Sequence, residues 1–278
     1  MKKIFSSADF IDHELAAFYD ELPLWSAPFG LKLLEAVDYS KPVEALDIGC
    51  GSGFPLLELA QRFGDQSHFC GIDLWAEGLD RIRSKVGFYQ IGNVDLILAS
   101  AEKMPVDNES ITLITSNNGL NNVSSLKDAL SECRRVSKKG ASMIFTANLP
   151  GTMSTFYDTF KSILHDTGLG NLRADVDIHI DLKRKSPEEM SRLTEEAGFN
   201  VISADVFSFQ LKFSDGTAFL NHHLIRLHFL QSWLSLISED NRVTIKDLLE
   251  RRLNQIASRS NGLFMEIPFC VYKAKRKD

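Results

Sequence analysis

Three glycines, Gly49, Gly51 and Gly53, alternate with other residues directly after a short apolar run at 43–48. Glycine adopts positive φ readily and leaves no side chain between the main chain and a ligand. Leucine and alanine then recur at helical spacing from 56 to 60. A strand, a glycine turn and a helix in this order predict the front edge of a nucleotide-binding α/β fold.

The spacing of the glycines distinguishes two kinds of nucleotide site. A dinucleotide site has the pattern G-x-G-x-x-G, but Phe54 stands at its third glycine here, and the pattern is D-x-G-x-G-x-G. A second strand is predicted at 68–73, and its last residue, Asp73, lies 20 residues beyond Gly53. A carboxylate at the end of that strand can accept hydrogen bonds from both hydroxyls of a ribose.

With these residues in place, the chain resembles the class I S-adenosylmethionine-dependent methyltransferases, and more narrowly the branch typified by ubiquinone and menaquinone biosynthesis methyltransferases. Three further segments follow in that family's order: LILASAEKMPV at 96–106, ITLITSNNGLNNV at 111–123 and ECRRVSKKGASMIFTA at 132–147. The resemblance covers residues 40 to 150 well and the remainder in outline. It implies S-adenosylmethionine as the cofactor, bound by Asp47, Gly49, Cys50, Gly51, Ser52, Gly53, Asp73, Leu74, Ser100, Ala101, Glu102 and Asn117.

The resemblance also implies individual contacts with the cofactor. Asp47 would receive backbone N–H bonds from the turn, or orient the cofactor's amino group through water. Glu102 would face the exocyclic amine of the adenine, although Ser100 stands where the family more often has an aspartate. Leu74 would offer an apolar face to the adenine ring, and a place in the core would explain it equally well.

Strands and helices alternate through the middle of the chain. Strands are predicted at 43–48, 68–73, 94–99, 111–116 and 141–147, and helices at about 55–63, 75–87, 124–137 and 153–166. This alternation implies right-handed crossovers and a parallel sheet with helices on both faces, whose ligands bind beyond the carboxyl ends of the strands. The predicted fold class is α/β, a Rossmann-like seven-stranded sheet that is mostly parallel, with a long sixth strand at 199–213 and an antiparallel last strand at 263–274.

We expect one methyltransferase domain over 1–278. It would comprise an N-terminal helical lid at 1–40, the Rossmann-like core at 41–213, a helical cap insertion at 214–260, and a final strand with a basic tail at 261–278. In the lid, an irregular segment at 22–30 precedes a helix at 31–37, because two prolines in six residues forbid a regular helix. By the resemblance, Tyr19 and Trp25 are candidates to contact the cofactor or the acceptor, and packing within the lid is the simpler alternative.

The cap insertion begins with a segment at 219–237, FLNHHLIRLHFLQSWLSLI, that is apolar over most of one predicted helix. Polar residues interrupt it, so it is not a membrane span. A helix apolar on two faces is buried from two sides. His222 and Arg226 share a face of this helix, where they can bind a carboxylate or phenolate, or His222 can act as a base. Ordinary polar residues at the rim of a cap would give the same pattern.

Two other segments hold candidate catalytic or acceptor-binding groups. In DIHID at 177–181, a strand would place His179 beside both acids, where it gains a proton more readily and can serve as a base. A solvated strand face is the alternative. The loop NNGLNN at 117–122 lies where the methyl group would emerge, and the amides of Asn118 and Asn121 can orient acceptor oxygens; a polar turn explains it as well. No single general base is assigned.

Composition narrows the class of partner. The chain has 278 residues, 44% hydrophobic and 24% charged, with a net charge of −6, which argues against a nucleic-acid partner. The four cysteines are far apart and form no C-x-x-C pair, which is typical of a reducing compartment. No metal-ligand spacing appears, and the N-terminus lacks the apolar segment of a signal peptide. We expect a cytoplasmic protein with no stable membrane insertion, and its oligomeric state stays open.

The expected function is methyl transfer from S-adenosylmethionine to a small molecule, apolar or aromatic because the cap is apolar. The loop at 117–122 lacks the N-P-P-[YF] sequence of DNA and protein amine methyltransferases, which lowers those classes. Two alternatives remain: a non-catalytic S-adenosylmethionine-binding protein, and a nicotinamide-dependent oxidoreductase, which would need a glycine at Phe54.

Overall fold

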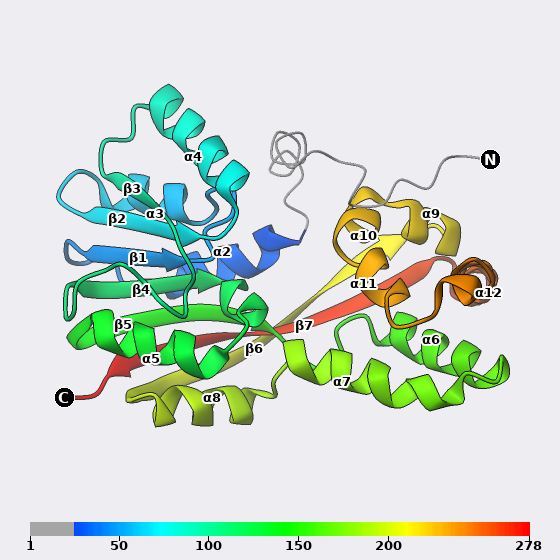
Figure 1. The fold of residues 1–278 in the computed structure, drawn as a ribbon. Helices are drawn as coiled ribbons and strands as arrows, with labels where there is room; N and C mark the ends of the chain where they lie inside the picture. The colour runs from blue at the N-terminus through cyan, green and yellow to red at the C-terminus, as the bar shows by residue number, and fades with distance from the viewer. Residues whose placement is uncertain (1–24) are drawn as a thin grey trace. The chain divides into compact units, whose positions relative to one another are not determined.

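The computed structural model describes residues 25–278, which form a seven-stranded sheet. The strands are β1 (Glu44–Ile48), β2 (His68–Asp73), β3 (Val94–Leu98), β4 (Ile111–Asn117), β5 (Ser137–Asn148), β6 (Phe199–Phe213) and β7 (Leu263–Arg276). Their order is β3-β2-β1-β4-β5-β7-β6 (Figure 1). The first five strands pair in parallel, whereas β7 is antiparallel to β5. The predicted fold class is confirmed.

The described residues divide into two compact units. We call them the core unit, 25–148, 185–207 and 269–278, and the helical unit, 149–184 and 208–268. The division falls inside β6 and β7, so each of these strands has residues in both units. The helical unit is larger than the predicted cap insertion at 214–260, because residues 149–184 belong with it.

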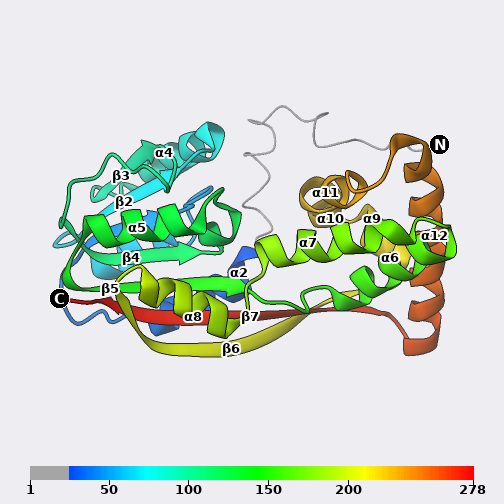
Figure 2. The same cartoon turned by 60° about the horizontal axis from the view of Figure 1, so that its bottom comes forward.

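Helices cover both faces of the sheet in the core unit. α3 (Leu56–Phe63) and α4 (Ala76–Tyr89) follow β1 and β2, and right-handed crossovers place them on one face. α5 (Leu126–Val136) follows β4 and lies with α8 (Pro187–Glu196) on the other face (Figure 2). Ser125 and Ser186 begin α5 and α8 by accepting hydrogen bonds from backbone N–H groups three residues on.

The first described helix, α2 (Ser26–Ala36), begins earlier than predicted. The prediction of an irregular segment up to residue 30 was wrong, because Pro28 lies in the first turn of α2, where a backbone N–H has no partner within the helix. Gly30 then lets α2 pack closely, since a Cβ there would collide with the ring of Phe54. The remainder of the predicted lid, including Tyr19, lies outside the described residues.

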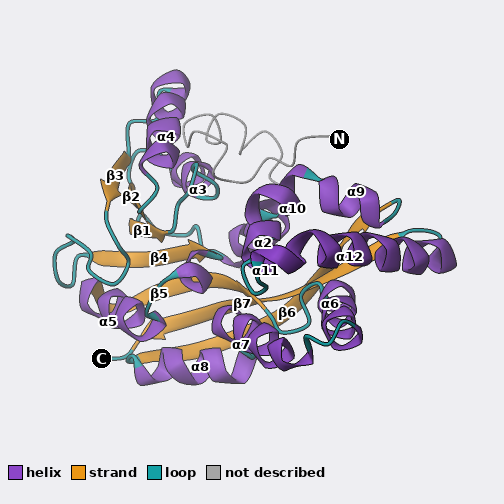
Figure 3. Cartoon of the chain, turned by 45° about the vertical axis from the view of Figure 1, so that its right-hand side comes forward, coloured by secondary structure: helices purple, strands orange, loops and turns teal. Residues whose placement is uncertain are grey.

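The helical unit consists of helices and loops apart from the ends of β6 and β7 (Figure 3). Its core is aromatic, with the rings of Phe156 and Trp233 stacked at 3.8 Å between centroids. The long helix contributes Ile245, Leu249 and Leu253, buried at four-residue intervals. The elements are α6 (Ser154–Asp166), η3 (Gly170–Leu172), α7 (Arg173–Lys183), α9 (Gly216–Asn221), α10 (His223–His228), α11 (Leu230–Leu234) and α12 (Glu239–Ser260).

The prediction of one helix over 219–237 was wrong, since α9, α10 and α11 are three short helices. At about 3.6 residues per turn, the buried side chains of this segment would point to all sides of a single straight helix. Because the helices are interrupted at His222 and Phe229, the buried side chains can point toward one core instead. The buried residues are Phe219, Leu220, Leu224, Ile225, Leu230, Trp233 and Ile237.

The prediction of a strand at 177–181 was also wrong, because this segment lies in α7. The alternation of acids and isoleucines fits a strand, but the same stretch puts Val176, His179 and Lys183 on one helical face, and Val176 is fully buried. Residues 177–181 therefore follow the helical period. No helix in the described part of the chain is long and apolar enough to span a bilayer.

Candidate active site

The carboxyl ends of four neighbouring strands bring the predicted cofactor residues together at one edge of the core unit's sheet (Figure 1). The glycine turn follows β1, Asp73 ends β2, Ser100 lies just beyond β3, and Asn117 ends β4. Backbone bonds join these ends: Gly49 N donates to Ile72 O at 2.9 Å and Ala99 N donates to Asp73 O at 3.1 Å. The convergence expected from the strand order is therefore present.

The glycine turn presents bare main chain. Gly49 has φ of +70°, and a Cβ there would come within 2.7 Å of the Cα of Gly119, in the 3₁₀ turn η2 (Gly119–Asn122). Gly51 has φ of +54°, but a Cβ there would have nothing within 4 Å. The first glycine is required by close packing, whereas the second leaves open space beside the backbone.

The carboxylate of Asp73 fixes the glycine turn. Its Oδ2 accepts a hydrogen bond from Gly51 N at 2.8 Å, and its Oδ1 accepts one from Trp75 N at 2.9 Å. A carboxylate has about four acceptor positions, so these two bonds leave capacity for two hydroxyl donors. The geometry is compatible with the ribose contact that the sequence predicted, and that contact stays a prediction.

Asp47 is a buried acid with one unused oxygen. Its side chain is 1% exposed, its Oδ1 accepts a hydrogen bond from Thr115 Oγ1 at 2.7 Å, and its Oδ2 has no partner among the described residues. Burial, and then the nearby charge of Asp73, raise the pKa of Asp47 to about 7, against the lowering by the Thr115 bond. A donor or cation that reached Oδ2 would relieve this cost. Backbone N–H bonds from the turn are not what holds Asp47.

Glu102 is engaged within the protein. Its Oε1 accepts hydrogen bonds from the backbone N–H groups of Ser124 and Ser125, at 2.6 and 3.2 Å, and its Oε2 accepts one from Ser100 Oγ. Partial burial would raise the pKa of Glu102, but these bonds outweigh it and the pKa is lowered. The carboxylate thus joins the loop after β3 to the start of α5. Its adenine contact stays a prediction, and most of its acceptor positions are already used.

Two apolar residues border this edge. Leu74 is 70% exposed directly after Asp73, so the core alternative for Leu74 was wrong. Trp25 precedes α2, its ring 5.4 Å from that of Phe29, and Asn117 Nδ2 donates to the adjacent Ser26 O at 3.0 Å. The exposed side chain of Leu74 therefore lies at the end of β2, and the start of α2 lies at the end of β4.

A family model for a methyltransferase domain matches residues 46–145, which include this edge from Asp47 to Asn118. The demethylmenaquinone methyltransferase of Listeria monocytogenes serotype 4a (strain HCC23) is 30% identical over 172 residues, which cover 58% of this chain and 72% of that relative. The chain belongs to the class I S-adenosylmethionine-dependent methyltransferases. The predicted family is confirmed, in the ubiquinone and menaquinone biosynthesis branch, and its cofactor is S-adenosylmethionine.

Two further comparisons show how much of the chain is similar to known methyltransferases. The demethylmenaquinone methyltransferase of Shouchella clausii (strain KSM-K16) is 28% identical over 123 residues, and the match spans about half of that relative, 52% of its length. An S-adenosylmethionine-dependent methyltransferase from Aquifex aeolicus shares the fold, with a TM-score of 0.52 at 19% identity, over 70% of this chain and 92% of that chain. The family assignment rules out the alternative of a nicotinamide-dependent oxidoreductase.

The groups at the carboxyl ends of β1, β2, β3 and β4 are chemically suited to bind S-adenosylmethionine. The open space beside Gly51 would admit a ligand against the main chain, and Asp73 retains acceptor capacity for ribose hydroxyls. The unused oxygen of Asp47 suits a cationic amino group, and Leu74 offers an exposed apolar face to a base. These residues are the ones that would hold the cofactor.

Asparagine and threonine side chains connect the ends of β4 and β5. Asn118 is 7% exposed, its Oδ1 accepts hydrogen bonds from Asn121 Nδ2 and Asn148 N, and its Nδ2 has no partner among the described residues. Thr146 Oγ1 donates to Asn117 Oδ1 at 3.0 Å. Thr146 and Asn148 were not among the predicted site residues, although both stand at the end of the predicted fifth strand, and ligands of such sheets bind beyond the carboxyl ends of the strands.

The other candidates, His179, His222 and Arg226, belong to the helical unit. His222 lies between α9 and α10, and its Nδ1 accepts a hydrogen bond from Leu224 N at 3.3 Å, so it caps α10 instead of lying on a helix face with Arg226. Burial, and then His223, lower the pKa of His222. Burial, and then the charges of Lys183 and Arg184, lower the pKa of His179, so the expectation of a readily protonated histidine was wrong. Their catalytic roles stay predictions.

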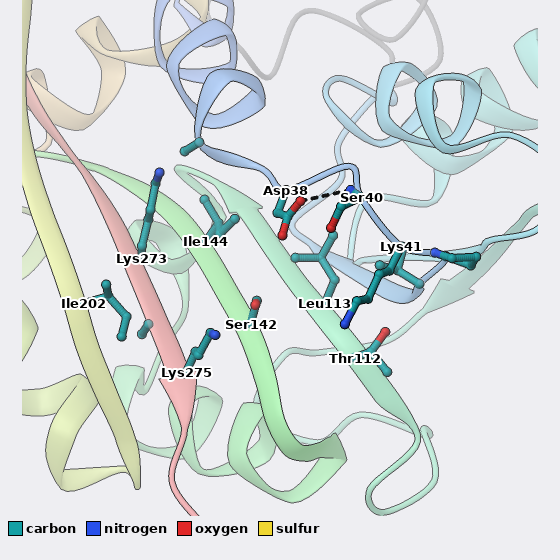
Figure 4. Close-up of a pocket in the computed structure, with 14 residues that line it drawn as sticks. Asp38, Ser40, Lys41, Thr112, Leu113, Ser142, Ile144, Ile202, Lys273 and Lys275 are labelled. Atoms are coloured by element: carbon teal, nitrogen blue, oxygen red, sulfur yellow. Dashed lines mark hydrogen bonds between the residues drawn. The ribbon is translucent and has the colours of Figure 1, made fainter.

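A cavity of about 470 Å³ lies elsewhere in the core unit (Figure 4). Its lining comes from 36–43, before β1, from the start of β4, the middle of β5 and the end of β7, and from Ile202 of β6. It includes Lys41, Lys273 and Lys275. The carboxylate of Asp38 accepts a hydrogen bond from Ser40 N at 2.9 Å at its rim. None of the predicted site residues lines this cavity.

Proposed function

We propose that this methyltransferase acts on a small-molecule acceptor with an apolar or aromatic body. Its relatives are named for demethylmenaquinone, an apolar quinone. The net charge of −6 disfavours nucleic-acid acceptors, and the loop after β4 reads NNGLNN instead of N-P-P-[YF]. These three observations support the same class of acceptor.

One observation supports the cofactor half of the proposal above all others, namely the main chain left bare at Gly51 with the carboxylate of Asp73 bonded to it at 2.8 Å. When bound, S-adenosylmethionine supplies a methyl group that its sulfonium already activates for transfer by in-line displacement. The residues of the chain then have chiefly to hold two reactants in line, and positioning contributes roughly 7–11 kcal/mol of barrier reduction in well-oriented reactions.

Asn118 is the best-placed candidate to orient the acceptor. Its Oδ1 is held by two donors, which fixes the plane of the amide, and its buried Nδ2 is left without a partner among the described residues. A fixed amide donor with no internal acceptor can bind an acceptor oxygen. General-base catalysis would add about 10²–10⁴-fold, and no residue is assigned that role.

The test is turnover of an acceptor panel, followed by formation of S-adenosylhomocysteine. The panel contains apolar phenols and quinols, aliphatic and peptide amines, and single-stranded DNA. We expect methylation of members of the first group only, and loss of turnover in Gly51→Ala. Methylation of the amines or the DNA would contradict the proposed acceptor class. Cofactor binding without turnover of any panel member would instead favour a non-catalytic binding protein.

A further inference from the structure

The helical unit contains a buried guanidinium, that of Arg184, which makes no ion pair with any residue of 25–278. Arg184 is 4% exposed, and its Nη2 donates a hydrogen bond to the hydroxyl oxygen of Tyr157 at 3.2 Å. Its Nε and Nη1 are buried and have no partner among the described residues. An arginine stays charged at every pH at which a protein is folded. A buried charge in this position is costly unless an anion neutralises it.

Three carboxylates close to Arg184 in the sequence do not pair with it. Asp177 pairs with Lys161 at 3.1 Å, and Glu189 pairs with Lys185 at 3.3 Å. Asp181 is exposed and makes no ion pair within residues 25–278. The charged groups that do act on this face of α7 are cationic, since Lys183 and Arg184 together lower the pKa of His179 after burial has done so. The charges that act on His179 are therefore both cationic.

Tyr157 adds a second unused donor at the same place. Its hydroxyl oxygen accepts hydrogen bonds from Trp233 Nε1 at 2.9 Å and from Arg184 Nη2 at 3.2 Å, which occupies both of its acceptor positions. Its own proton has no acceptor among the described residues. The guanidinium carbon also lies 5.0 Å from the centroid of the Tyr157 ring, which holds the two side chains together.

We propose that Arg184 and Tyr157 form a binding site for the carboxylate of an organic ligand with an apolar body. The N–H groups of Arg184 and the O–H of Tyr157 supply donors that find no acceptor within residues 25–278. Aromatic side chains pack against Tyr157: the rings of Phe156 and Trp233 lie 5.3 and 6.0 Å from its ring, and both residues are at most 1% exposed. Such surroundings favour an anion with an apolar body over free inorganic phosphate, which would have to give up more hydration.

The test measures anion binding by thermal shift and calorimetry, without S-adenosylmethionine, so its outcome is independent of methyl transfer. The probes are benzoate, octanoate, inorganic phosphate, and benzamide as an uncharged counterpart of benzoate. We expect the carboxylates to raise the Tm of the wild-type chain, and benzamide and phosphate to leave it unchanged. Arg184→Met should lower carboxylate affinity about tenfold or more, the size expected for hydrogen bonds to a charged group.

Two controls separate a ligand site from a structural arginine. Arg252→Met, in the same unit, removes an exposed arginine that pairs with Asp166 at 3.2 Å, and should keep the carboxylate shift. Unliganded Arg184→Met should be as stable as the wild-type chain or more so, because it removes an uncompensated buried charge. Tyr157→Phe should weaken carboxylate binding with the aromatic packing retained.

Three results would overturn the proposal. One is the absence of a shift with either carboxylate on the wild-type chain. Another is a carboxylate shift that persists in Arg184→Met. The third is a drop in Tm, or failure to fold, of unliganded Arg184→Met, since this would show that the guanidinium is already neutralised within the fold.

Discussion

The edge of the core unit around Asp73 and the helical unit differ in what determines their structure. At the edge, each functional position follows a local rule, because a strand end, a glycine and an acid define their geometry within a few residues. In the helical unit, the helix breaks of segments such as 219–237 are determined by the packing of their apolar side chains into a common core. The first region is specified by short-range sequence, and the second by long-range packing.

This contrast predicts that damage to the aromatic core of the helical unit leaves the cofactor edge largely intact. Trp233 is 1% exposed and stacks on Phe156, so Trp233→Ala should lower the free energy of unfolding by about 3–5 kcal/mol. Urea unfolding followed by far-UV circular dichroism measures the loss, and calorimetry with S-adenosylmethionine measures the edge, where affinity should stay within about threefold.

Trp233→Phe is the matched control for that substitution. It keeps an aromatic ring in the stack and removes the hydrogen bond to Tyr157 together with part of the indole volume, so it should cost about 1–2 kcal/mol, less than the alanine. If Trp233→Ala abolished cofactor binding in proportion to stability, the two regions would be one cooperative structure and the contrast would fail.

The buried acid of the edge predicts a pH dependence. The pKa of Asp47 is raised from 3.8 to about 7 in the fold, so the folded chain holds a proton that the unfolded chain releases near pH 4. Stability without cofactor is therefore greatest below about pH 4 for this group, and falls by up to roughly 4 kcal/mol as pH rises to about 7. Asp47→Asn cannot ionise, so its stability should fall less over this range. Parallel stability curves for the two proteins would refute the buried-acid account.

Substitution of Asp73 should weaken cofactor binding in the core unit without changing ligand binding in the helical unit. Asp73→Ala removes the acceptor for Gly51 N and for the predicted ribose contact, so affinity for S-adenosylmethionine should fall by about 2–3 kcal/mol in calorimetry. Affinity for a carboxylate at Arg184 should not change. Unchanged cofactor affinity in Asp73→Ala would remove the ribose assignment.

Sequence reasoning succeeded where one physical cause acts locally. β1 to β4 begin and end within about one residue of prediction, because period-two and glycine signals are short-range. It failed at 177–181, where alternation fits a strand but burial of Val176 follows a helix, and at His222, where a break in the chain replaces a helix face. The unpaired state of Arg184 could not be predicted, because it depends on which distant side chains do not reach it.

The most direct test of the account is a calorimetric titration of S-adenosylmethionine into three chains: wild type, Gly51→Ala and Gly140→Ala. Both glycines have positive φ, +54° and +72°, and a Cβ at either would meet nothing within 4 Å. Each alanine should therefore cost a similar backbone strain of about 1–2 kcal/mol. The account predicts that Gly51→Ala loses cofactor binding while Gly140→Ala retains it. Equal affinity of both variants for the cofactor would contradict the claim that the cofactor binds against the bare main chain at Gly51.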